Sequence, residues 1–254
     1  MKKIKLDELL VERGFFNSLD LAQRIVMTGD ILIDDIVITQ PGTLCDPKSR
    51  IRIKQKKSSY VSRGGDKLAQ FLESHPVEIK NKCCLDIGIS TGGFTDVLFR
   101  NNALHVLGID VGYGILDFQL RKNTQLSLLE RTNAREVTDI ELNTLLKKHH
   151  LSTKDIQLVV MDVSFISVFK ILPNLINFLN DTTEYIILIK PQFEGRKEWI
   201  DYGGIVTNPD YLTAIIEEVH TQFIDLNFEV INTQPSSIKG TKGNQEYFFH
   251  VKLT

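Results

Sequence analysis

Short apolar runs alternate with longer amphipathic segments over the C-terminal part of the chain. Glycine, asparagine and charged residues bound these runs, which is typical of buried strands, and the five amphipathic segments that fit between them predict helices. The expected strands lie near residues 83–87, 105–109, 126–129, 157–162, 185–190, 227–232 and 246–252. Alternation of strands and helices predicts a parallel sheet.

The last two expected strands break this alternation. Only residues 232–245 separate them, a segment too short to hold a crossover helix comfortably. Parallel neighbours need such a crossover, whereas antiparallel strands do not. We therefore predict a mostly parallel seven-stranded sheet whose final strand runs antiparallel to its neighbours.

The first part of the chain has the pattern of a small module with helices and strands. Apolar residues recur at helical spacing in two stretches, which predict short helices that end at Gly14 and Gly29. Asn17 and Ser18 can cap the second helix, because their side chains accept hydrogen bonds from the first helical amides.

Alternating apolar residues on both sides of Asp34-Asp35 predict a hairpin with these two residues in its turn. A last strand with basic residues on one face is expected at residues 51–54. We expect three parts: a small domain at 1–54, a basic linker at 55–66 and an α/β domain at 67–254.

The expected strand at 83–87 runs into a glycine-rich turn, and a helix should open near Gly93. Glycines permit positive φ and let the backbone approach a ligand, and the first helical amides lie just behind the turn. The next strand ends in Asp110, whose carboxylate can accept hydrogen bonds from a ribose. This order of elements is typical of a nucleoside-binding site.

The glycine spacing narrows the class of ligand. The turn follows G-x-x-x-G-G and not the G-x-G-x-x-G of dinucleotide-binding proteins. A nucleoside without a pyrophosphate fits better, and S-adenosylmethionine is the commonest such cofactor. The alternative is a glycine-rich turn in some other α/β protein.

Composition excludes several classes of protein. The hydrophobic and charged fractions are ordinary for a soluble chain, and the longest aliphatic or aromatic run, at 185–189, is too short to span a membrane. The basic start lacks the apolar core of a secretory signal, and three cysteines make neither a disulfide framework nor a zinc site. A reducing, cytoplasmic location and no bound metal are expected.

The charge is unevenly distributed. The chain carries a net −2, but residues 1–67 hold thirteen Lys or Arg against nine Asp or Glu. Residues 48–67 hold eight basic residues, with Asp66 as their only acid. Such a run is commonly a solvated surface, but one that joins two modules is also a candidate for contact with phosphates.

Charged residues stand beside strand ends or at a helix entry, where a ligand crevice is expected. They are Lys67, Asp162, Lys190 and Glu246. Each adjoins a run too apolar to hold a charge unless that charge is paired or functional. One alone is commonly a satisfied strand-end ion, but two lysines and two acids that converge suggest catalysis.

Such a group suits methylation of a ribose 2′-hydroxyl. An alcohol is a weak nucleophile near neutral pH, so a base must take its proton, and a lysine can do so where its surroundings lower its pKa. We expect Lys190 beside Lys67, with the two acids orienting them. Methylation of a base would need an Asn/Asp-Pro-Pro-Tyr loop or a nucleophilic cysteine, and neither stands at an expected strand end.

The N-terminal pattern contains Leu-Asp-x-x-Leu-Val-x-x-Gly at 6–14 and Met-Thr-Gly-Asp at 27–30. These segments resemble the small RNA-binding module named after ribosomal protein S-four, although Asp34-Asp35 departs from its usual Asn-Gly turn and makes that edge less suited to phosphate. The residues that we expect to contact RNA are Arg13, Arg24, Lys48, Arg52, Lys54 and Arg63.

Longer motifs cover most of the chain. They are Tyr-Val-Ser-Arg-Gly-Gly-x-Lys-Leu at 60–68, Asp-x-Gly-x-Ser-Thr-Gly-Gly-Phe-Thr-Asp at 86–96, Asp-Val-Gly-Tyr-Gly at 110–114, Glu-Arg-Thr-Asn at 130–133, Asp-x-Ser-Phe-Ile-Ser at 162–167, Lys-Pro-Gln-Phe-Glu at 190–194 and Lys-Gly-Asn-x-Glu at 242–246. Their order resembles the TlyA family of ribosomal RNA 2′-O-methyltransferases, which are also labelled haemolysins. Segment 196–202 departs from the family pattern and is a candidate substrate loop.

The resemblance implies a Rossmann-like, S-adenosylmethionine-dependent methyltransferase domain behind a small α+β RNA-binding domain. It implies that Lys67, Asp162, Lys190 and Glu246 form a catalytic tetrad, which methylates cytidine in small-subunit or large-subunit ribosomal RNA, or both. The residues that it places at the methyl donor are Asp86, Gly88, Ser90, Gly92, Gly93, Asp110, Val111, Asn133 and Asp162.

Two other functions stay open. One is a ribosome-assembly factor that binds RNA and cofactor without turnover, against which the intact tetrad argues. The other is a membrane-active haemolysin, for which the sequence has no spanning segment and no strongly amphipathic basic helix. The expected partners are ribosomal RNA and ribosomal subunits, without a membrane, and a monomer or weak homodimer is expected.

Overall fold

The computed structural model describes residues 3–16, 18–53, 58–240 and 242–254, and the chain divides into two compact units, residues 1–57 and 58–254. Residues 58–66 of the expected linker belong to the second unit, and the last four of them form the first turn of helix α3 (Arg63–Ser74). Asn17, Lys54 and residues 55–57 lie outside the described residues.

The N-terminal unit combines two helices with short strands, as predicted. A three-stranded sheet has the order β3-β2-β5, and β1 pairs with β4. The apolar faces of both helices pack with β2 and β5 in one small core. The elements are β1 (Ile4–Lys5), α1 (Leu6–Glu12), α2 (Leu19–Met27), β2 (Ile31–Ile33), β3 (Ile36–Ile38), β4 (Leu44–Cys45) and β5 (Ile51–Ile53).

The predicted hairpin turn forms although it lacks glycine. Asp34 and Asp35 both have positive φ, 49° and 65°, and Ile33 pairs with Ile36 across the turn. Aspartate tolerates this left-handed region better than most residues do. The amide of Arg50 also donates to Asp34 Oδ1 at 2.8 Å, which fixes the turn against the neighbouring strand connection.

The C-terminal unit alternates strands and helices. Its elements are α3, β6 (Cys83–Ile87), α4 (Gly93–Arg100), β7 (His105–Ile109), α5 (Phe118–Arg121), β8 (Leu126–Leu129), α6 (Asp139–Leu146), β9 (Ile156–Met161), α7 (Leu172–Ile176), β10 (Glu184–Ile189), α8 (Pro191–Glu194), α9 (Pro209–Asp225), β11 (Phe228–Pro235) and β12 (Tyr247–Leu253), with short 3₁₀ helices between some of them.

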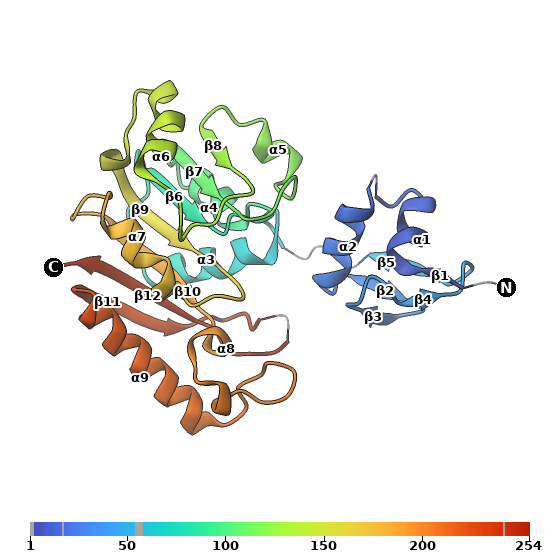
Figure 1. The fold of residues 1–254 in the computed structure, drawn as a ribbon. Helices are drawn as coiled ribbons and strands as arrows, with labels where there is room; N and C mark the ends of the chain where they lie inside the picture. The colour runs from blue at the N-terminus through green and yellow to red at the C-terminus, as the bar shows by residue number, and fades with distance from the viewer. Residues whose placement is uncertain (1–2, 17, 54–57, 241) are drawn as a thin grey trace. The chain divides into compact units, whose positions relative to one another are not determined.

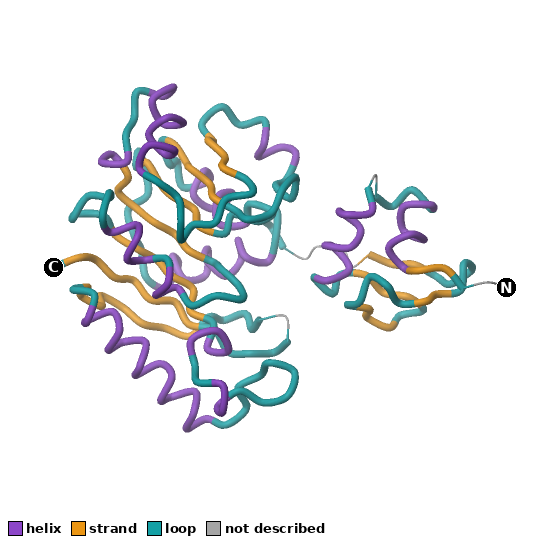
Figure 2. Tube along the Cα trace, viewed as in Figure 1, coloured by secondary structure: helices purple, strands orange, loops and turns teal. Residues whose placement is uncertain are grey.

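The strands of this unit form one seven-stranded sheet in the order β11-β12-β10-β9-β6-β7-β8, as labelled in Figure 1. Figure 2 shows the strands in orange and the helices beside them in purple. Strands β6 to β10 pair in parallel, whereas β12 is antiparallel to both β10 and β11. All seven predicted strands and the antiparallel last strand are confirmed. Six α-helices, rather than five, lie between β6 and β12 in the described residues, because α8 adds a single turn after β10.

Helices cover both faces of the sheet (Figure 1). Side chains alternate along each strand, so neighbouring residues reach opposite faces. Leu85 and Leu107 pack with α6, α7 and α9 on one face. Cys84 and Val106 pack with α3 and α4 on the other. The strands are therefore buried on both sides, which explains their almost unbroken apolar sequence.

The turn after β6 brings two backbone segments into contact. Gly88 has a φ of 81°, and a Cβ at this position would lie 2.5 Å from the carbonyl oxygen of Asp162. A side chain there would push the ends of β6 and β9 apart. Gly92 (φ 93°) precedes α4, which begins at Gly93 as predicted.

A carboxyl group is buried beneath this turn. Asp86 has no exposed surface, and its Oδ2 accepts a hydrogen bond from Thr95 Oγ1 at 2.6 Å. Burial raises the pKa of Asp86 to about 7, although the hydrogen bond from Thr95 opposes the shift. In the folded protein Asp86 therefore keeps its proton at pH values where an exposed aspartate is ionised.

Gly65 lets α3 approach α4 closely. A Cβ at Gly65 would lie 2.4 Å from Tyr60 Cβ and 2.9 Å from the carbonyl oxygen of Gly93. At neighbouring Gly64 the nearest atom, Ser62 Oγ, would be 3.4 Å away, which is an ordinary contact. Glycine at 65 is thus required by backbone packing.

We expect Gly65→Ala to lower the free energy of unfolding by about 1–3 kcal/mol, because the methyl group overpacks the contact between α3 and α4. Gly64→Ala is the matched control and should be neutral or slightly stabilising, since alanine favours the helix. Chemical denaturation measures both. Equal stability of the two variants would contradict the proposed packing role of Gly65.

We also expect Asp86→Asn to change how stability depends on pH. Between the unfolded pKa, near 3.8, and the folded value of about 7, the folded state binds the extra proton, so Asp86 makes stability fall as pH rises. The difference between variant and wild-type unfolding free energies should grow by about 1.4 kcal/mol per pH unit over this window. A difference that stays constant from pH 4 to 7 would show that Asp86 is ionised in the folded protein.

Candidate active site

The carboxyl ends of the central strands meet the start of the last strand at one edge of the sheet. The amide of Asp162 donates to the carbonyl of Ile87 at 3.0 Å, so the residues that follow β9 and β6 lie together. The antiparallel pairing of β10 with β12 ends at Ile189 and Tyr247, and Lys190 and Glu246 are the next residue on each strand. Strand register therefore gathers three of the four predicted catalytic residues.

Two ion pairs connect the four residues. Lys67 Nζ lies 2.5 Å from Glu246 Oε2, and Lys190 Nζ lies 2.6 Å from Asp162 Oδ1. The lysine side chains are only 11% and 12% exposed, and that of Glu246 is 3% exposed. Lys190 also donates to Ser164 Oγ at 2.8 Å. Each lysine is thus held by one of the two acids.

Helix α3 brings Lys67 to this edge. Gly64, one turn before Lys67, lies so close to the site that a Cβ there would be 3.7 Å from Asp162 Oδ2. The backbone of the loop before β12 covers the Lys67–Glu246 pair, because a Cβ at Gly240 would lie 2.5 Å from Glu246 Oε1. Backbone at a glycine therefore lies close to each of the two ion pairs.

The acid after β7 is held rigidly beside the glycine turn. Asp110 Oδ2 accepts from the amide of Ser90 at 2.8 Å, and Oδ1 accepts from the amide of Gly112 at 2.7 Å. The carbonyl of Asp110 accepts from the amide of Thr132 at 2.9 Å. Each carboxylate oxygen keeps a lone pair, so Asp110 can still accept hydrogen bonds from ligand hydroxyls.

The nine predicted cofactor residues fall into two groups. Gly88, Ser90, Asp110, Val111, Asn133 and Asp162 have exposed surface at the ends of β6 to β9, and Val111 is 72% exposed. Asp86, Gly92 and Gly93 are buried. A ligand at this edge would meet the first group, whereas the buried three shape the turn beneath it.

Three of the predicted RNA-contacting residues have partners within the N-terminal unit. Arg13 donates to the carbonyl groups of Pro47 and Ser49, and Arg24 pairs with Asp20. Arg52 Nη2 lies 3.0 Å from Asp35 Oδ1, so an acid of the unusual hairpin turn holds a predicted contact residue. Lys48 and Arg63 are exposed, and Lys54 lies outside the described residues.

Sequence reasoning missed two residues beside the tetrad. Ser164 accepts the hydrogen bond from Lys190, and Phe165 is 90% exposed with a positive φ of 67°. The ring of Phe165 lies 5.3 Å from that of Phe193, measured between centroids. A bulky residue held in the left-handed region costs energy and is often found at a functional site. Motif spacing gave no sign of this exposure.

Comparisons with known proteins agree with this geometry. Residues 60–253 match the family model of FtsJ-like methyltransferases. The chain is 33% identical over 252 residues to the 16S/23S rRNA (cytidine-2′-O)-methyltransferase TlyA of Mycobacterium tuberculosis, covering 99% of this chain and 90% of that protein. It is 34% identical over 247 residues to Hemolysin A of Brachyspira hyodysenteriae, covering 97% and 99%.

A solved structure of a candidate hemolysin from Streptococcus thermophilus is also similar. The TM-score is 0.72 at 33% identity, and the match covers 100% of this chain and 90% of that one. Over the described residues, no helix combines the length and apolar character needed to cross a membrane. These matches span both units, and the chain belongs to the TlyA family of FtsJ-like methyltransferases.

Proposed function

We propose that the protein transfers a methyl group from S-adenosylmethionine to the ribose 2′-hydroxyl of a cytidine in ribosomal RNA. The observation that carries this proposal is the tetrad, in which Lys67 pairs with Glu246 and Lys190 with Asp162 beside the glycine turn. A relative with 33% identity is named for this reaction. The site has the groups that the reaction needs.

The residues around the turn fit the cofactor. Gly88 leaves space where a side chain would strike the backbone of Asp162, and the fixed carboxylate of Asp110 suits ribose hydroxyls. Val111 and Asn133 flank Asp110 and would hold the base. Bound S-adenosylmethionine supplies a methyl group on a cationic sulfur, ready for attack by a nucleophile.

In this proposal Lys190 accepts the proton of the 2′-hydroxyl. To do so it must first release one of its own protons, and Asp162 Oδ1 at 2.6 Å is an acceptor within reach. Ser164 accepts a second hydrogen bond from the amine and so fixes its direction. Lys67, held by Glu246, keeps a positive charge near the oxygen that loses its proton.

Methylation of a base carbon is less suited to this chain. That chemistry needs a reactive thiolate, but Cys45, Cys83 and Cys84 are all buried. Burial raises the pKa of Cys83 to about 12, so it stays a thiol near neutral pH. A ribose hydroxyl, activated by an amine, is the target that the side chains of the site favour.

The substrate must reach a recessed site. A nucleotide inside a duplex would need to leave its stack, and Phe165, exposed beside Asp162, offers an aromatic face to the base. The small N-terminal unit and residues 48–67 would bind folded RNA through phosphates and shape. We propose that the protein acts on one or both ribosomal subunits in the cytoplasm, as a monomer or a weak homodimer.

We expect Lys190→Met to lower the rate of methyl transfer to unmodified small or large ribosomal subunits by about 100- to 10,000-fold, because it removes the general base. Lys67→Met combined with Glu246→Gln should also lower the rate, and it avoids leaving the buried Glu246 unpaired. Transfer of labelled methyl from S-adenosylmethionine measures the rates. Lys170→Ala, at an exposed site on the same unit, is the control.

Binding of S-adenosylhomocysteine, measured by calorimetry, should be unchanged in these variants. Wild-type rates in Lys190→Met would remove Lys190 from the mechanism. Cofactor binding by the wild-type protein without transfer to either subunit would contradict the proposed enzyme and favour a ribosome-assembly factor.

A further inference from the structure

The segment that departs from the family pattern, residues 196–202, leads into a small hairpin at 201–205. Residues Asp201 and Ile205 make an antiparallel bridge, and Gly203 and Gly204 have positive φ in the turn between them. Asp201 Oδ2 accepts hydrogen bonds from the amide and the hydroxyl of Thr207, at 3.2 and 2.5 Å. The hairpin is therefore fixed at both strands of its stem.

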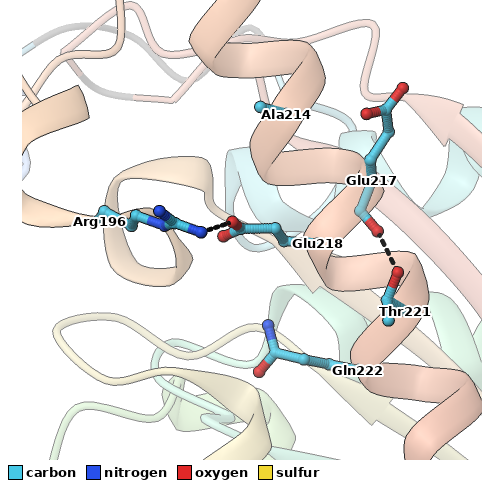
Figure 3. A pocket seen from close by; sticks show the side chains of 6 residues that line it. All are labelled: Arg196, Ala214, Glu217, Glu218, Thr221 and Gln222. Atoms are coloured by element: carbon cyan, nitrogen blue, oxygen red, sulfur yellow. Dashed lines mark hydrogen bonds and ion pairs between the residues drawn. The ribbon is translucent and has the colours of Figure 1, made fainter.

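The chain before the hairpin is attached to α9. Arg196 pairs with Glu218 at 2.5 Å, beside a hollow of about 510 Å³ on α9 (Figure 3). Its guanidinium lies 4.7 Å from the centre of the Trp199 ring. Trp199 stacks on Tyr211 of α9 with a ring separation of 5.8 Å. Aromatic packing thus holds the base of the hairpin.

Hydrogen bonds connect the tip of the hairpin to the loop that precedes β12 and Glu246. Asn244, which is only 3% exposed, donates to the carbonyl of Gly204 at 2.8 Å and accepts from the amide of Val206 at 2.9 Å. Lys242 Nζ donates to the carbonyl of Gly203 at 2.6 Å. Asn244 stands two residues before Glu246, so the position of the hairpin is set by the same loop that positions the tetrad.

This fixed hairpin presents Tyr202 to solvent. Its side chain is fully exposed, although a tyrosine ring commonly buries much of its surface. Lys239 and Lys242 lie on the adjoining loop between β11 and β12, and no acid is present in residues 236–245. Residues 68–254 as a whole hold seventeen basic and twenty-three acidic residues. The positive charge of the loop at 236–245 is therefore an exception within this part of the chain.

We propose that Tyr202 stacks on an exposed base of the RNA substrate next to the nucleotide that enters the active site. An aromatic ring beside a lysine, here Lys242 at the neighbouring Gly203, is a combination that binds single-stranded nucleic acid, since the ring takes a base and the cation takes a phosphate. The ring is preorganised, because the turn that carries it is already ordered. The inference rests on the proposed function, whose substrate is RNA.

We expect Tyr202→Ala to lower kcat/KM for methylation of ribosomal subunits by about 5- to 100-fold, the range for loss of one stacked base. Tyr202→Phe keeps the ring and should stay close to wild type. Ile140→Ala, at a 77% exposed position on α6, is the control for loss of an exposed apolar side chain. Affinity for S-adenosylhomocysteine should be the same in all of them.

Equal kcat/KM for wild type and Tyr202→Ala would overturn the proposal and leave the enzyme itself unaffected. An equal loss in Tyr202→Phe would assign the effect to the hydroxyl group and also overturn stacking. A change in cofactor affinity would indicate a structural role. Absence of transfer by the wild-type protein would count against the proposed function instead.

A second measurement tests the contact independently of turnover. Tyr202 is replaced by photoreactive p-benzoyl-phenylalanine in the full chain, which is then irradiated with purified ribosomal subunits. We expect crosslinks to ribosomal RNA. Crosslinks to ribosomal proteins alone, or none above the level of the same replacement at Ile140, would show that Tyr202 does not meet RNA.

Discussion

The site depends on the pairing of charges at the ends of strands that are buried on both faces. Lysine and carboxylate groups at such positions are costly unless each finds a partner, because the surrounding side chains are apolar. Lys67 and Glu246 lie near the two ends of the C-terminal unit in the sequence, and Lys67 Nζ is 2.5 Å from Glu246 Oε2. Their pairing holds α3 to the last strand, and in the proposed mechanism it also places a cation beside the reacting oxygen.

Close backbone approach is the second requirement of this arrangement. Gly88 lets the ends of β6 and β9 touch, Gly65 lets α3 approach α4, and Gly240 lets a loop cover Glu246. A side chain at any of these three positions would separate segments that carry residues of the proposed active site. The same contacts that stabilise the unit therefore also determine the geometry of its active site.

Much of this architecture was predictable because the strands are apolar along their whole length and end in glycine or charge. The short separation of the last two strands predicted the antiparallel pairing of β12. The sequence did not predict which carboxylate each of the two lysines would pair with, because that depends on the register between strands that are distant in sequence. Helix α3 begins within the expected linker. Gly64 and Gly65 disfavour a helix on propensity alone, but Gly65 packs against Tyr60 and Gly93 within the first turn of α3.

Exposure of single side chains was also beyond the reach of sequence patterns. Phe165 and Tyr202 are aromatic residues of the kind that normally supports a core, and periodicity does not reveal that both face solvent. Partners of surface arginines are equally hidden from sequence patterns. Arg13, Arg24 and Arg52 each have a partner within the N-terminal unit, and Arg13 and Arg52 are nevertheless exposed.

The most direct test of the central claim is the chemical position of the transferred methyl group. Unmodified ribosomal subunits are incubated with the protein and labelled S-adenosylmethionine, and their RNA is digested to nucleosides for mass spectrometry. We expect the label in 2′-O-methylcytidine, because the tetrad activates a ribose hydroxyl. Label on a base, with every ribose unmodified, would contradict the role of the two lysine–carboxylate pairs.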